Sequence, residues 1–164
     1  SMAEIDTPLG VMVAVGNDEA LYLLEFLDHP NTPGKIKRLL RQTQATLVAA
    51  TAKSIQSITL ELERYFKDEL QIFTTPLFLL GTPFQKRVWQ ELQKIPYGHT
   101  RSYKEIAVLI GKPTACRAVA RASGANILPI IIPCHRVISS DGTTGGYSGG
   151  LERKKWLLQH EGIC

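Results

Sequence analysis

The hydrophobic and polar positions of the first 70 residues change their spacing along the chain. Short β-prone runs at 11–15 and 21–26 are separated by the turn cluster Gly16-Asn17-Asp18, which is typical of a hairpin. A basic stretch with scattered leucines, 35–47, and a second stretch ending at Lys67 then show helical spacing. The apolar positions of the second stretch are Ile55, Ile58, Leu62, Tyr65 and Phe66. The pattern therefore predicts a small sheet followed by two helices.

β-Type residues return at 71–80, and this run ends at Gly81. Because glycine commonly interrupts regular structure, we place a domain boundary there. The sequence thus predicts an N-terminal α/β domain at 1–80 and a C-terminal domain at 81–164.

Two capping boxes mark helix starts in the second half of the chain. Residues 82–85 match the box with Pro83 at the first helical position, and they open an amphipathic helix that stops at Pro96. Residues 102–105 match a second box, which starts a helix ending at Gly111. We expect two short helices here.

A third helix is expected at 115–123, where small residues surround two arginines. A helix, a glycine-containing turn and a short second helix form the outline of a helix-turn-helix. Small side chains would allow close approach to a DNA duplex, with Arg117 and Arg121 four residues apart on one face. A tightly packed helix pair with two solvated arginines explains this pattern about as well.

Composition narrows the class of protein. The 164 residues are 44% hydrophobic, which is enough for a core in one domain or two small ones. No run approaches the roughly 18 apolar residues of a membrane span, and no leader pattern is present, so we expect a cytoplasmic protein with no membrane partner. Three cysteines without Cys-x-x-Cys spacing argue against a disulfide framework and a structural metal site. The net charge of +4 is compatible with a polyanionic partner.

Cys134 is the residue of this chain whose surroundings most suggest chemical reactivity. It follows the apolar run 127–132, which predicts a buried strand, and His135 and Arg136 come directly after it. An imidazole or a positive charge lowers the pKa of a thiol and makes it a nucleophile. In an extended segment, however, neighbouring side chains point to opposite faces, so proton transfer to His135 needs a turn or a bridging water. On the pair alone, the favoured interpretation is a buried small hydrophobe beside a satisfied histidine.

Six ordered sequence blocks between about Phe84 and Gly162 favour the catalytic interpretation. They lie at 102–103, 117–119, 126, 133–137, 145–150 and 156–162. Together they resemble the O6-alkylguanine-DNA alkyltransferases, also called methylated-DNA–protein-cysteine methyltransferases. The resemblance implies an α+β fold. A ribonuclease-H-like sheet-and-helix domain would precede a mostly helical DNA-binding and alkyl-acceptor domain with a winged-helix-like helix-turn-helix.

The function that this resemblance implies is direct-reversal DNA repair. Alkyl groups on O6 of guanine, and on O4 of thymine, would pass irreversibly to Cys134, once per molecule and without a cofactor or metal. The partner would be double-stranded DNA containing alkylated guanine, bound through the minor groove with the damaged base flipped out. A monomer that associates with the nucleoid is expected.

The resemblance also implies roles for individual residues. Cys134 would accept the alkyl group, His135 would take the thiol proton through a water, and Glu161 would hold the other imidazole nitrogen. Asn126 would shape the pocket, and Tyr103 would donate a hydrogen bond to the leaving guanine. The matching DNA-binding positions are Arg117, which would fill the gap left by the flipped base, Arg121, Ser102, Thr114 and Ala118. The matching base-pocket positions are Val137, Tyr147, Ser148 and Gly149.

Other functions remain open at this point. A non-catalytic protein that recognises alkylated bases is the main alternative, although Cys134 argues against it. A helix-turn-helix regulator would not need the thiol, and a cysteine hydrolase would not need the DNA-binding half. The glycine-rich run 142–150 fits a loop that closes over a base or a flexible surface loop, and it lacks the residues of a phosphate-binding loop. The small residues 123–125 predict tolerance for larger alkyl groups.

Overall fold

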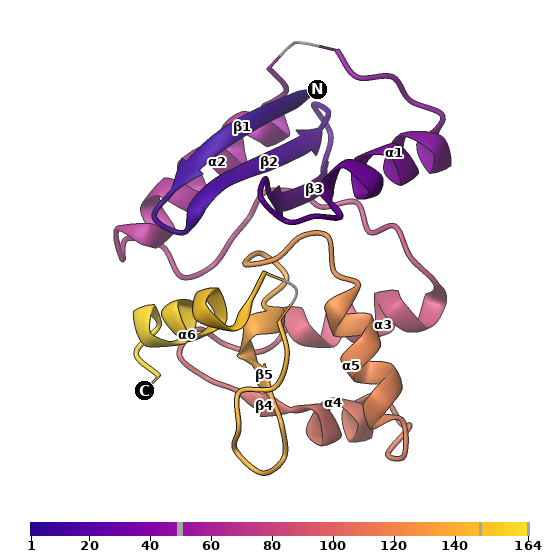
Figure 1. Ribbon diagram of the computed structural model, residues 1–164, viewed down its shortest axis with the longest axis vertical. Coiled ribbons are helices and arrows are strands. Elements are labelled where there is room, and N and C mark those ends of the chain that lie inside the picture. Colours follow the sequence, from indigo (N-terminus) through magenta and orange to yellow (C-terminus); the bar gives the residue numbers. More distant parts are fainter. Residues whose placement is uncertain (49–50, 148, 164) are drawn as a thin grey trace. The chain divides into compact units, whose positions relative to one another are not determined.

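The structure, a computed structural model, describes residues 1–48, 51–147 and 149–163. It divides into two compact units, Ser1–Leu80 and Gly81–Cys164 (Figure 1). Mixed α and β structure is present, as the sequence predicts. No helix in the described part of the chain has the length and apolar character needed to cross a bilayer.

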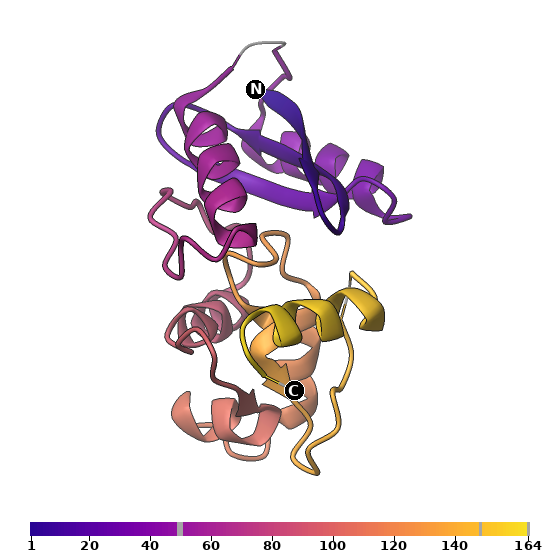
Figure 2. The ribbon, with the colours of Figure 1, turned by 90° about the vertical axis from the view of Figure 1, so that its left-hand side faces the viewer.

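The first unit is built on a three-stranded antiparallel sheet. Its strands are β1 (Met2–Thr7), β2 (Gly10–Gly16) and β3 (Leu21–Phe26), and they lie in the order β1-β2-β3. Helix α2 (Lys53–Phe66) packs against β1 and β2, while α1 (Thr32–Thr43) packs against β3 (Figure 2). The predicted hairpin and both predicted helices are therefore present, and β1 is an additional strand.

The prediction of β structure over 71–80 is wrong. Only an isolated bridge between Leu77 and Leu21 forms in this segment. The buried carboxylate of Glu61 on α2 accepts the backbone N–H groups of Thr74 and Thr75, at 2.8 and 2.9 Å. Because these donors are satisfied by a side chain, they do not join a strand ladder, and the segment runs irregularly along the unit.

The second unit is mostly helical. Helices α3 (Pro83–Gln93) and α4 (Tyr103–Leu109) both pack against α5 (Cys116–Gly124), and the indole N–H of Trp89 donates to the carbonyl of Ala122 at 2.8 Å. Both predicted capping boxes are present with both of their hydrogen bonds. The three predicted helices are confirmed within a residue or two of their expected bounds.

A short pair of parallel strands and a last helix complete this unit. Strand β4 (Arg101–Ser102) pairs with β5 (Val137–Ile138), and β5 follows the 3-10 turn η1 (Cys134–Arg136). After β5 the chain makes a hairpin loop, visible in both ribbon views (Figure 1, Figure 2), before α6 (Leu151–His160). Helix α6 contacts η1.

The segment 127–132 is buried, but it is not the strand that its apolar residues predict. The N–H of Ile132 donates to the carbonyl of Leu128 at 2.9 Å, which curls the segment into a turn. Ile130 has a φ of +75°, a left-handed conformation that is costly for a β-branched residue. Cys134 therefore opens a helical turn, and the alternation of side chains expected for an extended segment does not apply to Cys134 and His135.

Candidate active site

Cys134 lies at the start of η1, with only 5% of its surface exposed. The side-chain amide of Asn126, at the end of α5, donates to Cys134 Sγ at 3.3 Å and to the carbonyl of Ile132 at 3.0 Å. The amide oxygen of Asn126 accepts the N–H of Leu128 at 2.9 Å. One side chain thus holds both the turn before the cysteine and the sulfur itself.

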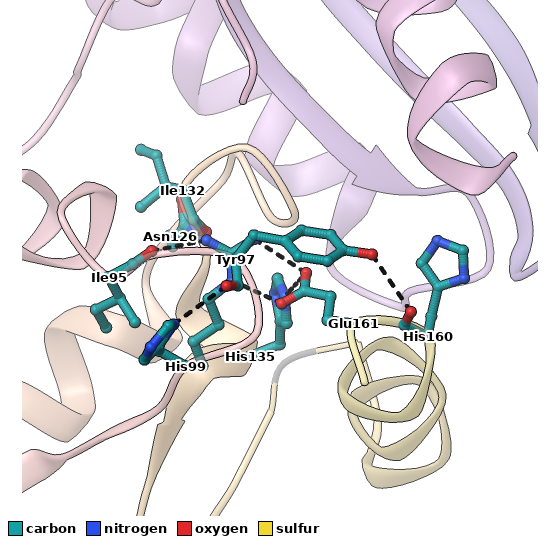
Figure 3. Close-up of polar contacts among 9 residues, drawn as sticks. Ile95, Tyr97, His99, Asn126, Ile132, His135, His160 and Glu161 are labelled. Carbon is teal, nitrogen blue, oxygen red and sulfur yellow. Dashed lines mark hydrogen bonds and ion pairs between the residues drawn. The ribbon is translucent and has the colours of Figure 1, made fainter. Parts of the chain in front are cut away.

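A buried carboxylate, Glu161, lies beside His135, the residue that follows the cysteine (Figure 3). Its Oε2 is 2.7 Å from His135 Nε2. The guanidinium of Arg136 donates to both oxygens of the same carboxylate, at 2.7 and 3.0 Å, and to the carbonyl of Ile95 at 2.8 Å. The end of α6 is thereby tied to η1 by three charge-assisted hydrogen bonds.

The electrostatics of this cluster favour a neutral histidine beside an ionised carboxylate. Burial acts to raise the pKa of Glu161, but its bonds and charge interactions with His135 and Arg136 lower that pKa to about 2. Burial lowers the pKa of His135 below its usual value, and the charges of Arg136 and Lys154 act in the same direction. A neutral His135 facing an ionised carboxylate carries its proton on Nε2, so Nδ1 is left as an acceptor.

His135 Nδ1 is positioned to receive a proton. Among the described residues it is buried and has no hydrogen-bond partner. A neutral imidazole with an unpaired, buried lone pair next to a cysteine in sequence has the chemistry needed to accept a proton.

The pKa shifts predict that acid destabilises the fold. The pKa of His135 and that of Glu161 are both lower in the folded protein than in the unfolded chain, so the unfolded chain binds protons first as the pH falls. The stabilising contribution of His135 is complete above about pH 6.5 and decreases below it, and that of Glu161 decreases between about pH 4.5 and 2. Urea unfolding at pH 7.5, 6.5, 5.5 and 4.5 should show a falling free energy of unfolding, with a smaller fall between pH 6.5 and 5.5 in His135→Gln. Equal stability of the wild-type protein at pH 7.5 and 5.5 would contradict this expectation.

Lys154 is a buried cation that the sequence reasoning did not single out. Its side chain is fully buried, and Nζ donates to the carbonyls of Val137 and Gly146 at 2.6 and 3.0 Å. Burial lowers the pKa of Lys154 to about 8, while the charge of Cys134 acts to raise it. The charge interaction is mutual, so a protonated Lys154 favours the thiolate form of Cys134. Helical spacing offered a signal, because Lys154 shares the face of α6 that carries Leu157, Leu158 and Glu161.

The cysteine opens on a cavity of about 250 Å³. The residues around it come from α4, α5, η1 and the glycine-rich loop: Tyr103, Ala120, Ser123, Gly124, Cys134, Ser139, Gly145, Gly146 and Tyr147. Burial raises the pKa of Tyr103, and the charge of Cys134 raises it further, although a hydrogen bond from the backbone of Gly146 acts to lower it. The phenol therefore stays protonated and can donate a hydrogen bond within the cavity.

Gly145 permits the loop to close on Tyr103. It has a φ of +69°, and a Cβ at this position would lie 3.1 Å from the Tyr103 ring and hydroxyl. Both the backbone conformation and the close approach require glycine here.

The exposed face of α5 carries the predicted DNA-binding arginines. Arg117, Ala118 and Arg121 are exposed, as is Thr114 in the turn before the helix, whereas Val119 and Ala122 are buried. Ser102 differs from the other predicted contacts, because its hydroxyl accepts the N–H of Glu105 at 3.0 Å as the cap of α4. Residues 81–164 contain 12 of the 19 lysines and arginines but only five of the 15 acidic residues, so positive charge is concentrated in this unit.

Comparisons with known proteins identify the family of this chain. The family model described as 6-O-methylguanine DNA methyltransferase, DNA binding domain, matches residues 83–163. A methylated-DNA–protein-cysteine methyltransferase of Methanosarcina barkeri is 46% identical over 157 residues, covering 96% of this chain and 94% of the relative. This chain belongs to the methylated-DNA–protein-cysteine methyltransferase family. The resemblance recognised in the sequence is confirmed.

Further relatives of the methyltransferase family extend the match to the whole chain. A relative named as the same enzyme in Mycolicibacterium paratuberculosis is 41% identical, with 96% of this chain and 89% of the relative covered. The crystal structure of Mycobacterium tuberculosis OGT in complex with DNA aligns with a TM-score of 0.84 at 40% identity, covering 98% of this chain and 91% of that one. The O6-methylguanine-DNA methyltransferase of Pyrococcus kodakaraensis aligns with a TM-score of 0.68 at 25% identity, covering 99% and 98%.

The structure brings together some of the residues that the methyltransferase resemblance implicates and leaves others apart. Cys134 and Asn126 are in contact, as are His135 and Glu161, and Tyr103 and Tyr147 line the cavity beside Cys134. Val137 and Gly149 are not among its lining residues. Val137 is buried and accepts from Lys154, while the carbonyl of Gly149 accepts from Arg153 at 3.2 Å. Ser148 lies outside the described residues. Arg136 and Lys154 also belong to the site, although the resemblance gave neither of them a role.

Within 1–48, 51–147 and 149–163, no group of three or more His, Cys, Asp and Glu side chains is arranged to hold a metal ion.

Proposed function

We propose that this methyltransferase repairs alkylated DNA by moving the alkyl group from O6 of guanine to Cys134. The observation that carries the proposal is the arrangement around the sulfur. Cys134 opens on a cavity, a donor from Tyr103 lies across it, and a neutral His135 with an accepting Nδ1 follows it in η1. Methylated-DNA–protein-cysteine methyltransferase is also the name carried by relatives of 41 to 46% identity.

The chemistry begins with formation of the thiolate. The thiol proton of Cys134 passes through a bridging water to His135 Nδ1, and Glu161 stabilises the resulting imidazolium through Nε2. The amide of Asn126 and the charge of Lys154 stabilise the thiolate. A soft, partly desolvated thiolate is suited to displacement at carbon.

In the transfer step the sulfur attacks the alkyl carbon from the side opposite O6. The new carbon–sulfur bond forms as the carbon–oxygen bond breaks, and the electron pair of that bond leaves on guanine. Tyr103 donates a hydrogen bond to the base as it gains negative charge. The guanine anion takes up one proton, which balances the proton that His135 removed from the thiol, and the protein retains a thioether.

The reaction ends after one event per molecule. A thioether is a poor leaving group, and no second thiol lines the described part of the cavity. Cys116 lies instead at the half-buried start of α5. The protein is therefore a single-use methyltransferase in this proposal.

DNA is bound, in this proposal, through the exposed face of α5. We infer that the helix-turn-helix of α4 and α5 enters the minor groove and that Arg117 takes the place of the flipped nucleotide. Arg121, Thr114 and Ala118 would contact the backbone and groove beside it, with Ser102 at the start of α4. The β4–β5 pair and the following hairpin would form a winged-helix-like element, and the sheet of the first unit would be ribonuclease-H-like. The protein would act as a cytoplasmic monomer on nucleoid DNA.

The base pocket would accept more than methylguanine. We propose that Val137, Tyr147, Ser148 and Gly149 surround the flipped base, and that O4-alkylthymine is a second substrate. Small side chains near the pocket rim support tolerance for larger alkyl groups. A strict preference for methyl over benzyl lesions would contradict that tolerance.

Arg117→Ala should slow the repair of duplex DNA far more than the reaction with a free alkylated base. Arg117 is exposed and has no proposed part in the transfer step. Its replacement removes both a positive charge and the side chain that would occupy the place of the flipped base in the DNA stack. Loss of one phosphate or stacking contact of this kind costs about 1 to 3 kcal/mol, or about 5- to 150-fold in rate on the duplex. Rates with an O6-methylguanine duplex and with free O6-benzylguanine provide the comparison, and Lys86→Ala on α3 is the control for charge alone. Equal effects of Arg117→Ala on both substrates would remove Arg117 from the flipping step.

The decisive test of the function is mass spectrometry of the tryptic peptide 122–136 after incubation with an O6-methylguanine duplex. This peptide contains Cys134 and no other cysteine. A gain of one CH2 group, at one per molecule and absent with undamaged DNA, is expected. Tight binding of the lesion without any gain would favour the alternative function, a non-catalytic protein that recognises alkylated bases.

A further inference from the structure

Helix α5 contributes one wall of the cavity in front of Cys134. Ala120, Ser123 and Gly124 line it, and their spacing places them on one face of the helix. A Cβ added to Gly124 would meet nothing within 4 Å among the described residues. This wall is therefore made of small side chains with open space in front of them.

Ser123 is the polar residue of that wall, and its hydroxyl is unsatisfied. The residue is 4% exposed, and within the part of the chain that the structure describes its Oγ has no hydrogen-bond partner. Two buried threonine hydroxyl groups elsewhere in the described chain are paired, and Ser54 Oγ, which has no partner either, packs against Gly16 and does not line this cavity. Thr32 donates to the carbonyl of Phe26 at 2.7 Å, and Thr75 bonds to Ser57 and Glu61. Because buried polar groups are normally satisfied, an orphan hydroxyl at a cavity wall points to a missing ligand group.

The position of the unpaired Ser123 hydroxyl determines which part of a ligand it would contact. The carbon under attack must lie against Cys134 Sγ, so the remainder of a longer alkyl group extends into the same cavity that Ser123 lines. Tyr103, on the α4 side, accepts a hydrogen bond from the backbone of Gly146, and in the proposed mechanism its hydroxyl donates to the base. Ser139 lies by the glycine loop, with its Oγ 3.3 Å from the place of a Cβ on Gly145.

We propose that Ser123 forms a polar subsite for the far end of the alkyl group, which makes this protein prefer adducts ending in a hydroxyl over apolar adducts of the same size. The proposal rests on the alkyl-transfer function above and adds a specificity-determining residue to it. A 2-hydroxyethyl group can both donate to and accept from the serine hydroxyl, whereas a propyl group leaves that hydroxyl unsatisfied. A methyl group is too short to reach the subsite.

The test is a comparison of single-turnover rate constants on three duplexes. They carry O6-methylguanine, O6-(2-hydroxyethyl)guanine and O6-propylguanine, and each rate is divided by the methyl rate of the same variant. In the wild-type protein the hydroxyethyl rate should exceed the propyl rate, and Ser123→Ala should reduce that ratio by about 3- to 10-fold, the worth of one neutral hydrogen bond. Ser139→Ala, which removes a hydroxyl from the same cavity, should keep the wild-type ratio.

Each outcome separates this proposal from the function on which it rests. An unchanged hydroxyethyl-to-propyl ratio in Ser123→Ala, with methyl transfer present in the wild-type protein, overturns the subsite and leaves the function standing. An equal reduction in Ser139→Ala also overturns it, because the preference would then belong to general polarity. Absence of methyl transfer by the wild-type protein overturns the function itself. The melting temperature of Ser123→Ala should equal or exceed that of the wild type, since no internal hydrogen bond is lost.

Discussion

Cys134→Ser will abolish alkyl transfer while the protein still binds a lesion-containing duplex. A serine hydroxyl has too high a pKa to ionise at neutral pH, and its oxygen is a poorer nucleophile than a thiolate towards carbon. Removal of a covalent nucleophile costs about 10⁴-fold or more in rate. The replacement is small enough to retain the contact with Asn126 and the buried position in η1. Mass spectrometry of the intact protein measures transfer, and a gel-shift titration measures binding.

Cys116→Ser is the matched control for this variant. Cys116 is the other cysteine of the described chain, and it lies on α5 outside the cavity lining. The control should accept one methyl group per molecule at the wild-type rate. Continued methylation of Cys134→Ser at another residue would show that the nucleophile has been misassigned.

Glu161→Gln will slow transfer and destabilise the fold together. The carboxylate fixes the tautomer of His135 and pairs with Arg136, both inside the protein. A neutral amide cannot neutralise an imidazolium, so the general base is weakened by about 10²- to 10⁴-fold. Leaving the buried guanidinium of Arg136 without its counter-ion costs about 3 to 5 kcal/mol of folding free energy. Single-turnover kinetics and urea unfolding measure the two effects.

Glu152→Gln makes the same chemical change at an exposed position on the same helix. Its stability should lie within about 0.5 kcal/mol of the wild type, and its rate should be unchanged. If Glu161→Gln matched this control in stability, the three hydrogen bonds to Glu161 would not hold α6 to η1. If it matched the control in rate, His135 would not act as the base.

Local signals in the sequence predicted the helices of this protein well. The capping boxes at Thr82 and Ser102 place the starts of α3 and α4, because the side chain and backbone that satisfy each other lie three residues apart. The predictions that fail concern segments whose hydrogen-bond partners lie elsewhere in the chain. Residues 71–80 have the composition of a strand, but the carboxylate of Glu61 accepts the N–H groups of Thr74 and Thr75. No local sequence pattern predicts these hydrogen bonds.

The sequence motif indicated several residues of the candidate site, and the packing of the folded chain shows which other residues join them. The resemblance indicated Cys134, His135 and Glu161, but spacing along the chain could not show that Arg136 shares the carboxylate, since that bond spans 25 residues. It also could not show that the segment before Cys134 is a turn, because apolar residues such as Ile130 suit a buried strand as well as a buried turn.

The short pairing of β4 with β5 limits where the chain can gain or lose residues without disturbing the candidate site. Tyr103 directly follows β4 and Cys134 lies three residues before Val137, so the register of Arg101 with Val137 fixes both residues relative to one another. Insertions in the exposed turn between α4 and α5 would leave this register untouched. Removing a single residue between Cys134 and Val137 would instead shift the sulfur relative to the tyrosine. Related chains should therefore keep an invariant count of residues from the cysteine to β5.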